Sequence, residues 1–114
     1  MLSFLWSSNS KYVAISGTAR IYGVCFIVDA DTGKVIELPD ADTLSAQMDA
    51  ASQPASSRPD PYFMAAEWIN DTTIRVNYRW TAQEGENEVS GTYDYDTARG
   101  NIVSNTSKIG GPPG

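Results

Sequence analysis

Residues 28–38 (VDADTGKVIEL) and 93–103 (YDYDTARGNIV) decide the fold of this 114-residue chain, because the second stretch nearly repeats the first. Each stretch runs from aromatic or aliphatic residues into an Asp-x-Asp-Thr turn, passes a glycine and ends on an aliphatic pair. The shared Asp-x-Asp-Thr motif aligns residues 29–32 with residues 94–97. A sub-sequence used twice predicts two similar structural units in one short chain.

The composition is that of a single acidic globular domain. The chain has 41% hydrophobic and 19% charged residues, and its length allows one modest core. The net charge of −6 disfavours a nucleic-acid partner, since such binding requires clusters of Lys and Arg, and it favours a basic protein. No apolar run is long enough for a membrane span, and the apolar start lacks the basic residues of a signal peptide. We therefore expect that any targeting segment is absent from this chain.

The sequence offers little for catalysis. It contains no histidine, which removes the commonest general base and zinc ligand. Its one cysteine, Cys25, lies in an apolar run and is expected to be a small buried hydrophobic residue. The aspartates of the two turns are expected to cap the local backbone, and residues 29–33 (DADTG) lack the later carboxylate that completes a calcium loop. We expect no enzymatic activity, no cofactor and no metal.

Strand signals, meaning β-branched and aromatic residues between turn formers, dominate both halves. They predict strands at residues 11–16, 21–28, 34–38, 73–80, 88–95 and 100–105. The stretch 21–28 (IYGVCFIV) is apolar at nearly every position, which predicts a central strand buried on both faces. In the stretch 73–80, apolar residues alternate with Arg75, Asn77 and Arg79, which predicts one buried face and one wet face.

A segment of different composition separates the two halves. Residues 40–52 begin with helix-capping residues and then place apolar residues on one face, which predicts a short helix. Residues 53–61 (QPASSRPDP) contain three prolines and nothing to bury, which predicts an exposed loop with a restricted backbone. This loop either caps the open end of the core or presents Ser56, Ser57 and Arg58 to a partner at reduced entropic cost.

Each half also opens on a tryptophan that precedes a polar turn and a strand, at Trp6 (WSSNSKYVAIS) and at Trp68 (WINDTTIRVNY). Without the insertion, each unit is close to the ~40–45 residues of a four-stranded propeller blade. The chain here resembles the blade repeats of β-propellers of the TolB and WD40-like type. The matching residues are Trp6, Ser7, Asn9, Lys11, Ala14, Asp29, Thr32, Gly33 and Lys34 in the first unit, and Trp68, Asp71, Asp94 and Thr97 in the second.

The resemblance implies a single all-β domain of two antiparallel sheets that resemble two propeller blades. Closed propellers need at least four blades, so two units imply an open, incomplete propeller whose sheets bury their apolar faces against each other. The implied boundaries are a first unit at about 4–38, a helix and Pro-rich loop at 39–61, a second unit at about 62–108 and a flexible tail at 109–114.

A small acidic protein of this plan is also similar to the immunity proteins that bacteria keep against type VI secretion peptidoglycan amidases. In that family, a loop plugs the active-site groove of the effector. The resemblance implies a periplasmic, non-enzymatic inhibitor of a small, basic, secreted hydrolase. The residues that it assigns to partner binding are Ser56, Ser57 and Arg58 in the loop, with Tyr62, Asn70 and Asp71 as flanking contacts.

Two alternatives of other classes stay open. A structural module would complete its sheets with another chain or with a second copy of itself. A carbohydrate-binding module would use exposed aromatic rings as sugar platforms. The second half supplies many aromatic residues, of which we expect most to fill the core and the others to be exposed near a sheet edge as interface anchors. These residues are Tyr62, Phe63, Trp68, Tyr78, Trp80, Tyr93 and Tyr95.

Overall fold

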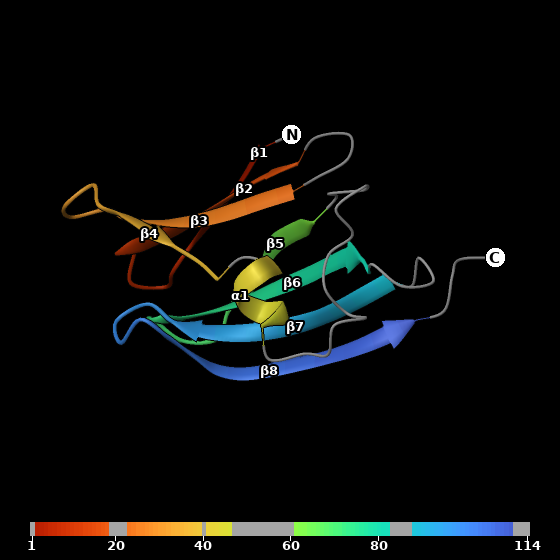
Figure 1. Cartoon of the computed structure of the whole chain (residues 1–114). Coiled ribbons are helices and arrows are strands. Elements are labelled where there is room, and N and C mark those ends of the chain that lie inside the picture. The colour runs from red at the N-terminus through yellow and green to blue at the C-terminus, as the bar shows by residue number, and fades with distance from the viewer. Residues whose placement is uncertain (1, 19–22, 40, 47–60, 83–87, 111–114) are drawn as a thin grey trace.

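The computed structural model describes residues 2–18, 23–39, 41–46, 61–82 and 88–110. These residues form two antiparallel sheets of four strands each, in which consecutive strands are neighbours (Figure 1). The first sheet contains β1 (Leu2–Trp6), β2 (Tyr12–Thr18), β3 (Gly23–Asp29) and β4 (Val35–Glu37), and the second contains β5 (Tyr62–Trp68), β6 (Thr73–Thr81), β7 (Glu88–Asp96) and β8 (Asn101–Gly110). The predicted all-β class and the two antiparallel sheets are confirmed.

Six strands lie where runs of β-branched and aromatic residues predict them, and the other two, β1 and β5, open the two sheets. Both β1 (LSFLW) and β5 (YFMAAEW) lack β-branched residues, so their strand signal rests on aromatic residues alone. Their pairing with β2 and β6 makes them strands. The last strand, β8, extends to Ile109 and Gly110, which pair with Val89 and Glu88 of β7, and the rest of the expected tail lies outside the described residues.

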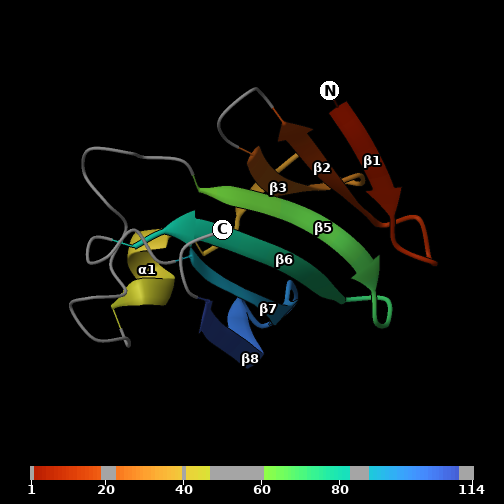
Figure 2. The ribbon, with the colours of Figure 1, turned by 90° about the vertical axis from the view of Figure 1, so that its right-hand side faces the viewer.

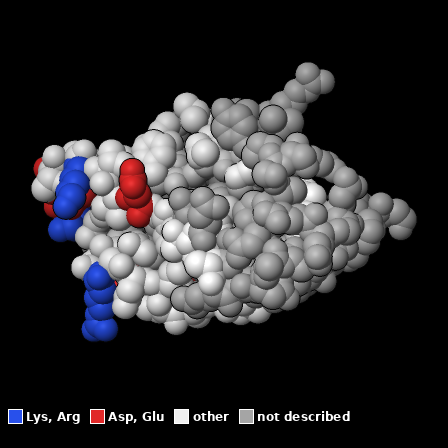
Figure 3. All heavy atoms as spheres, viewed as in Figure 1, with Lys and Arg blue, Asp and Glu red and all other residues white. Residues whose placement is uncertain are grey.

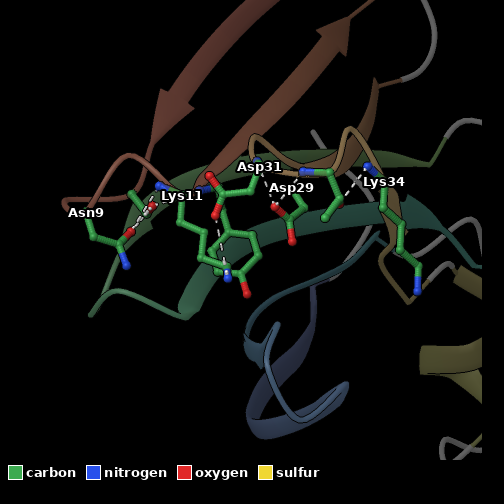
Figure 4. A network of polar contacts seen from close by, with 8 residues as sticks. Asn9, Lys11, Asp29, Asp31 and Lys34 are labelled. Atoms are coloured by element: carbon green, nitrogen blue, oxygen red, sulfur yellow. Dashed lines mark hydrogen bonds and ion pairs between the residues drawn. The ribbon is translucent and has the colours of Figure 1, made fainter.

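The turn after β3 is held by one aspartate, as the sequence predicts. Oδ1 of Asp29 accepts hydrogen bonds from the backbone N–H groups of Asp31 (2.9 Å) and Thr32 (3.4 Å) (Figure 4). Gly33 closes the turn at φ 74°, in the left-handed region that favours glycine, and its N–H donates to the Asp29 carbonyl (2.7 Å). Asp29 therefore serves the backbone of its own turn.

The turn after β7 repeats this arrangement around Asp96, not around Asp94. Oδ1 of Asp96 accepts the N–H groups two and three residues further on (2.9 and 3.1 Å), and Gly100 closes the turn at φ 73°. The alignment of Asp29 with Asp94 is therefore wrong by two residues, because the second stretch holds two aspartates and only the later one stands at the strand end. Asp94 itself lies within β7.

With Asp29 aligned to Asp96, equivalent strand positions pair alike in the two sheets. In the first sheet, Val13 of β2 pairs with Val28 of β3. The equivalent pair in the second sheet is Ile74 of β6 and Tyr95 of β7. Side chains alternate between the two faces of a strand, so this pairing defines equivalent faces. We call the face of each sheet that carries these pairs face a, and the opposite face, face b.

The sheets pack with face a of the second sheet against face b of the first (Figure 2). The buried strand residues of this core are Tyr12, Ala14 and Ile27 from the first sheet and Phe63, Ile74, Val76, Tyr78, Trp80, Val89, Tyr93 and Tyr95 from the second. Across the sheets, the rings of Tyr12 and Trp68 stack with centroids 6.0 Å apart. The expectation that most aromatic residues of the second half fill the core is confirmed.

The strand β5 ties the two sheets together with polar contacts. The backbone N–H of Ala65 donates to Oγ of Ser16 (3.1 Å) in β2. The indole N–H of Trp68 donates to the carbonyl of Leu5 (2.8 Å) in β1. A β-bulge between Ala65 and Glu67 moves the strand on by one residue, so that Trp68 pairs with β6 on the face that meets the first sheet.

One helical turn, α1 (Ala41–Ser45), follows β4, and its Ala41 and Leu44 belong to the core. Residues 47–60, which contain the rest of the predicted helix and most of the predicted Pro-rich loop, lie outside the described residues. Within the described ranges, no helix is long and apolar enough to cross a membrane.

The strand β3 is not buried on both faces, contrary to the prediction from its apolar sequence. On face b, Ile27 is fully buried. On face a, Val24 is 49% exposed, and Phe26 and Val28 are only half-buried. The reason is the position of the first sheet, which offers its face b to the second sheet and leaves its face a on the outside. An apolar face without a cover is the starting point for the functional site.

Candidate functional site

Face a of the first sheet carries five of the eight large apolar side chains that the described residues expose. All four strands of the sheet contribute to it. We call this surface the open face; its residues are Leu2, Phe4, Trp6, Val13, Ile15, Val24, Phe26, Val28 and Val35. The strand register places all of these side chains on the same face of the sheet.

The open face is continuous from edge to edge of the sheet. One row of paired residues is Trp6, Val13, Val28 and Val35, and the next is Phe4, Ile15, Phe26 and Glu37. A third row contains Gly17, where an added Cβ would lie 3.3 Å from Leu2 and 3.8 Å from Val24. The side chains of Leu2 and Val24 therefore approach each other over the glycine and leave little gap in the apolar surface.

The open face exposes a large apolar patch to water. Leu2 is 67% exposed, Phe4 60% and Trp6 54%. Because a whole aromatic side chain covers ~150–250 Å², the five exposed residues present on the order of 500 Å² of apolar surface, near the upper end of what monomers leave uncovered. Among the described strand residues of this face, only Glu37 is charged, and it stands on the short edge strand β4. Such a surface fits contact with another apolar surface.

Face b of the second sheet, the other outer surface, has the opposite chemistry. At the positions equivalent to Ala14 and Ile27 it carries Arg75 and Asp94. Their side chains form two hydrogen bonds, Nε to Oδ1 (2.9 Å) and Nη2 to Oδ2 (3.2 Å), and Nη1 of Arg75 also donates to Glu67 (3.2 Å). A buried apolar pair in the first sheet is thus an ion pair in the second.

The pKa values show that this ion pair stays charged near neutral pH. The hydrogen bonds from Arg75 hold the pKa of the Asp94 carboxyl below its usual value, and a hydrogen bond from the Ser104 hydroxyl (3.1 Å) acts in the same direction. The same contacts with Asp94 raise the pKa of Arg75. Face b of the second sheet therefore keeps fixed charges that favour contact with water.

Other polar groups continue this wet face along β6 and β7. The hydroxyl of Thr92 donates to Oδ1 of Asn77 (2.9 Å), and the guanidinium of Arg79 lies 4.1 Å above the ring centre of Tyr62. A shallow hollow of about 500 Å³ lies here, lined by Tyr62, Met64, Asn77, Tyr78, Arg79, Ser90, Gly91 and Thr92. The predicted wet face of residues 73–80 is confirmed by the exposure of Asn77 and Arg79.

Charged side chains also gather at the end of the molecule that holds the turns after β3 and β7 (Figure 3). Lys11 lies 3.9 Å from Asp31 and both side chains are exposed, whereas Arg99 is exposed and lies 3.9 Å from Asp96, which is largely buried; both pairs are loose. Within the part of the chain that the structure describes, no three His, Cys, Asp or Glu residues gather in a group suited to a metal ion. This end of the molecule is a solvated turn surface.

Two reactive side-chain types lie between the sheets, where neither has the properties of a catalyst. Burial raises the pKa of the Cys25 thiol, although a hydrogen bond with Ser16 opposes the shift, so the thiol is a poor nucleophile at neutral pH. Burial also raises the pKa of Tyr93. Within the described ranges, the side chains around Cys25 and Tyr93 do not form a catalytic site.

The residues that the resemblance to immunity proteins assigns to partner binding are not all gathered at one place. Ser56, Ser57 and Arg58 lie outside the described residues. Tyr62 is the first residue of β5, whereas Asn70 and Asp71 lie in the turn that follows its last residue. A strand of seven residues is ~20 Å long, which separates Tyr62 from the other two.

Asn70 and Asp71 also have contacts that shape the fold. Oδ1 of Asn70 accepts the backbone N–H groups of Thr72 (3.0 Å) and Thr73 (2.9 Å) and so holds the turn between β5 and β6. Asp71 accepts a hydrogen bond from the hydroxyl of Ser8, which joins this turn to the equivalent turn of the first sheet. Asn70 therefore holds its own turn, and Asp71 links the turns of the two sheets.

The most exposed aromatic residues lie on the first sheet and not on the second, where we expected them. Phe4 and Trp6 stand on the open face, whereas Tyr62 and Trp68 are half-buried and the other aromatic residues of the second half are buried. The strict alternation of Leu2, Phe4 and Trp6 is the sequence signal that marks this face.

Comparisons with known proteins identify no relative of this chain. No protein family, no curated protein and no solved structure matches this chain. Its function is therefore inferred from its own surfaces.

Proposed function

We propose that this protein is a non-enzymatic protein-binding module that docks its partner on the open face. The observation that supports the proposal is an apolar sheet face, on the order of 500 Å² in area, with one charge at its edge. Phe4 and Trp6 on this face are of the type that anchors protein interfaces. Apart from Glu37 at its edge, the described residues of the open face offer none of the polar side chains that orient a sugar, which favours a protein over a carbohydrate as the ligand.

Two valines provide a matched test of the open face. Val35 on the open face is 53% exposed, and Val103 on β8 of the second sheet is 55% exposed. Lysine at either position adds the same charge at an exposed edge-strand site, so both variants should fold. With wild type, Val35→Lys and Val103→Lys as baits in source lysate and secretome, we expect a protein that the first and third retain and the second does not. Calorimetry with that purified protein then measures its affinity for each bait. Equal affinity for all three baits would contradict the proposal.

A more specific form of the proposal is an immunity protein that inhibits a small, basic peptidoglycan amidase. The net charge of −6 supports a basic partner, and the insertion at 39–61 supplies Ser56, Ser57 and Arg58 for the groove of the enzyme. The test is the rate of peptidoglycan cleavage by purified basic amidases with and without this protein. We expect inhibition by the wild type and none by the double variant Ser56→Trp, Ser57→Trp, which should keep the wild-type circular dichroism spectrum. Inhibition that survives in the double variant rules out the loop as the inhibitory element.

A further inference from the structure

We infer that the partner on the open face is a second copy of this chain, held by a twofold contact between two open faces. This inference rests on the proposed function and names its partner. The first support is the internal equivalence of the sheets. Val13, Ile15 and Phe26 of the open face, of which Val13 is itself only 6% exposed and the other two are half-buried, correspond to Ile74, Val76 and Tyr93 of the second sheet, all three of which are fully buried against the first sheet. The open face thus has the composition of a covered layer.

Copies of the chain have two ways to cover the open face. In a head-to-tail stack, the open face of one copy would meet face b of the second sheet of the next copy, as the two sheets meet within the chain. That contact would bury Arg75, Asp94 and Arg79, and the burial of charged groups is costly even where they are paired. The first sheet avoids this cost because Ala14 and Ile27 stand in place of Arg75 and Asp94. The chemistry of the second sheet therefore disfavours the head-to-tail stack.

In a face-to-face contact, each open face meets the same face of the other copy. Such an isologous contact closes after two copies and needs no second complementary surface. Among the described strand residues of the open face, only Glu37 brings a charge, and it is exposed at the end of the edge strand β4. The contact would bury on the order of 1,000 Å² in total, about the size at which specific interfaces begin. An aligned sandwich is one of the two arrangements that face-to-face packing of twisted sheets produces.

The experiment is sedimentation equilibrium of the whole chain and three lysine variants. We expect the wild type to be a dimer at roughly 100 µM, where a micromolar contact is largely formed. Val35→Lys places a charge on the edge strand β4, within the apolar surface that the twofold contact covers, and should weaken the dimer by about tenfold or more. Val103→Lys, at a similarly exposed valine on the second sheet, should leave the dimer unchanged. Met64→Lys, on face b of the second sheet, should also leave it unchanged, since Met64 is exposed on the face that the twofold contact does not use.

Each other result overturns the inference in a recognisable way. A monomeric wild type excludes the second copy as partner. The proposed function still stands in that case if another protein is retained by the wild-type and Val103→Lys baits but not by the Val35→Lys bait. A dimer weakened by Met64→Lys as strongly as by Val35→Lys, or larger assemblies of the wild type, would indicate the head-to-tail stack. A dimer that both Val35→Lys and a second open-face variant, Phe4→Lys, leave intact places the contact elsewhere. Circular dichroism of each variant confirms that the sheets are retained.

Discussion

Tyr93 is fully buried in the core, and its hydroxyl meets no hydrogen-bond partner among the described residues. A buried polar group without a partner lowers the stability of a fold, because it loses its hydrogen bonds to water on burial. The hydroxyl of Tyr78 is the contrasting case, since it donates to Oδ1 of Asn105 at 2.7 Å. The two tyrosines pack against each other, with ring centroids 6.0 Å apart, so they allow a comparison in one environment.

Replacing Tyr93 by phenylalanine should therefore stabilise the protein. We expect Tyr93→Phe to raise the free energy of unfolding by about 1 kcal/mol, because it removes only the unpaired hydroxyl. Tyr78→Phe removes a hydrogen-bonded hydroxyl and should lower the free energy of unfolding by about 1 kcal/mol. Urea unfolding of both variants measures the difference. Loss of stability in Tyr93→Phe would show that its hydroxyl has a partner in solution.

The ion pair of Arg75 and Asp94 predicts a pH dependence of stability. The pKa of Asp94 is lowered in the folded protein, so the pair stabilises the fold above the ordinary carboxyl pKa of about 4. This contribution is lost as the pH falls through the lowered pKa of Asp94. We expect Asp94→Asn to lower the melting temperature at pH 7, and the gap from the wild type to narrow below about pH 4.

The control for this prediction is Asp31→Asn. It removes a 3.9 Å pair between exposed side chains and should change the melting temperature little at any pH. Thermal unfolding followed by circular dichroism between acid and neutral pH measures both variants. A gap between Asp94→Asn and the wild type that stays constant through the acid range contradicts the assignment of the ion pair.

At the scale of the elements, the middle of β7 depends on a glycine. Gly91 pairs with Tyr78 of β6, whose ring lies close over it. A Cβ at Gly91 would lie 2.5 Å from the Tyr78 hydroxyl oxygen and 2.5 Å from the carbonyl oxygen of Thr106 in β8. Only a residue without a side chain therefore lets Tyr78 cross β7 and reach Asn105.

Alanine at Gly91 should lower the free energy of unfolding by about 1–3 kcal/mol, through the overlap with Tyr78 and the Thr106 carbonyl. The matched control is Gly17→Ala in β2. Its new Cβ would lie 3.3 Å from the tip of the exposed Leu2 side chain, which can move aside. Chemical unfolding compares the two variants, and equal loss of stability in both would mean that strand glycines, not this crossing, determine the effect.

How well the elements can be predicted depends on which physical term forms them. In β6, apolar residues alternate with Arg75, Asn77 and Arg79, and this pattern predicts both the strand and its two faces. The sequence of β5 has aromatic but no β-branched residues, and the strand is stabilised by its pairing with β6 and by its contacts with Ser16 and Leu5. The bulge that turns Trp68 inward is likewise a product of packing between sheets.

At the scale of the whole molecule, the repeat predicts two sheets but not which faces meet. The apolar sequence of β3 indicates that both of its faces favour burial, and the described residues cover only one of them. The sequence therefore does not predict that this face stays exposed, although the alternation of Leu2, Phe4 and Trp6 indicates an apolar face. The partner-binding role of Ser56, Ser57 and Arg58 stays a prediction, because these residues lie outside the described ranges.

If copies of this chain associate through the open face, as we propose, the ion pair on the second sheet also limits how far they assemble. A chain with an adhesive surface at both ends adds to itself without limit and forms a fibre. The charged pair Arg75 and Asp94 disfavours a contact on face b of the second sheet, so assembly stops once the open face is occupied. Two substitutions that copy the first sheet, Arg75→Ala and Asp94→Ile, would remove this terminator and give a chain prone to polymerise.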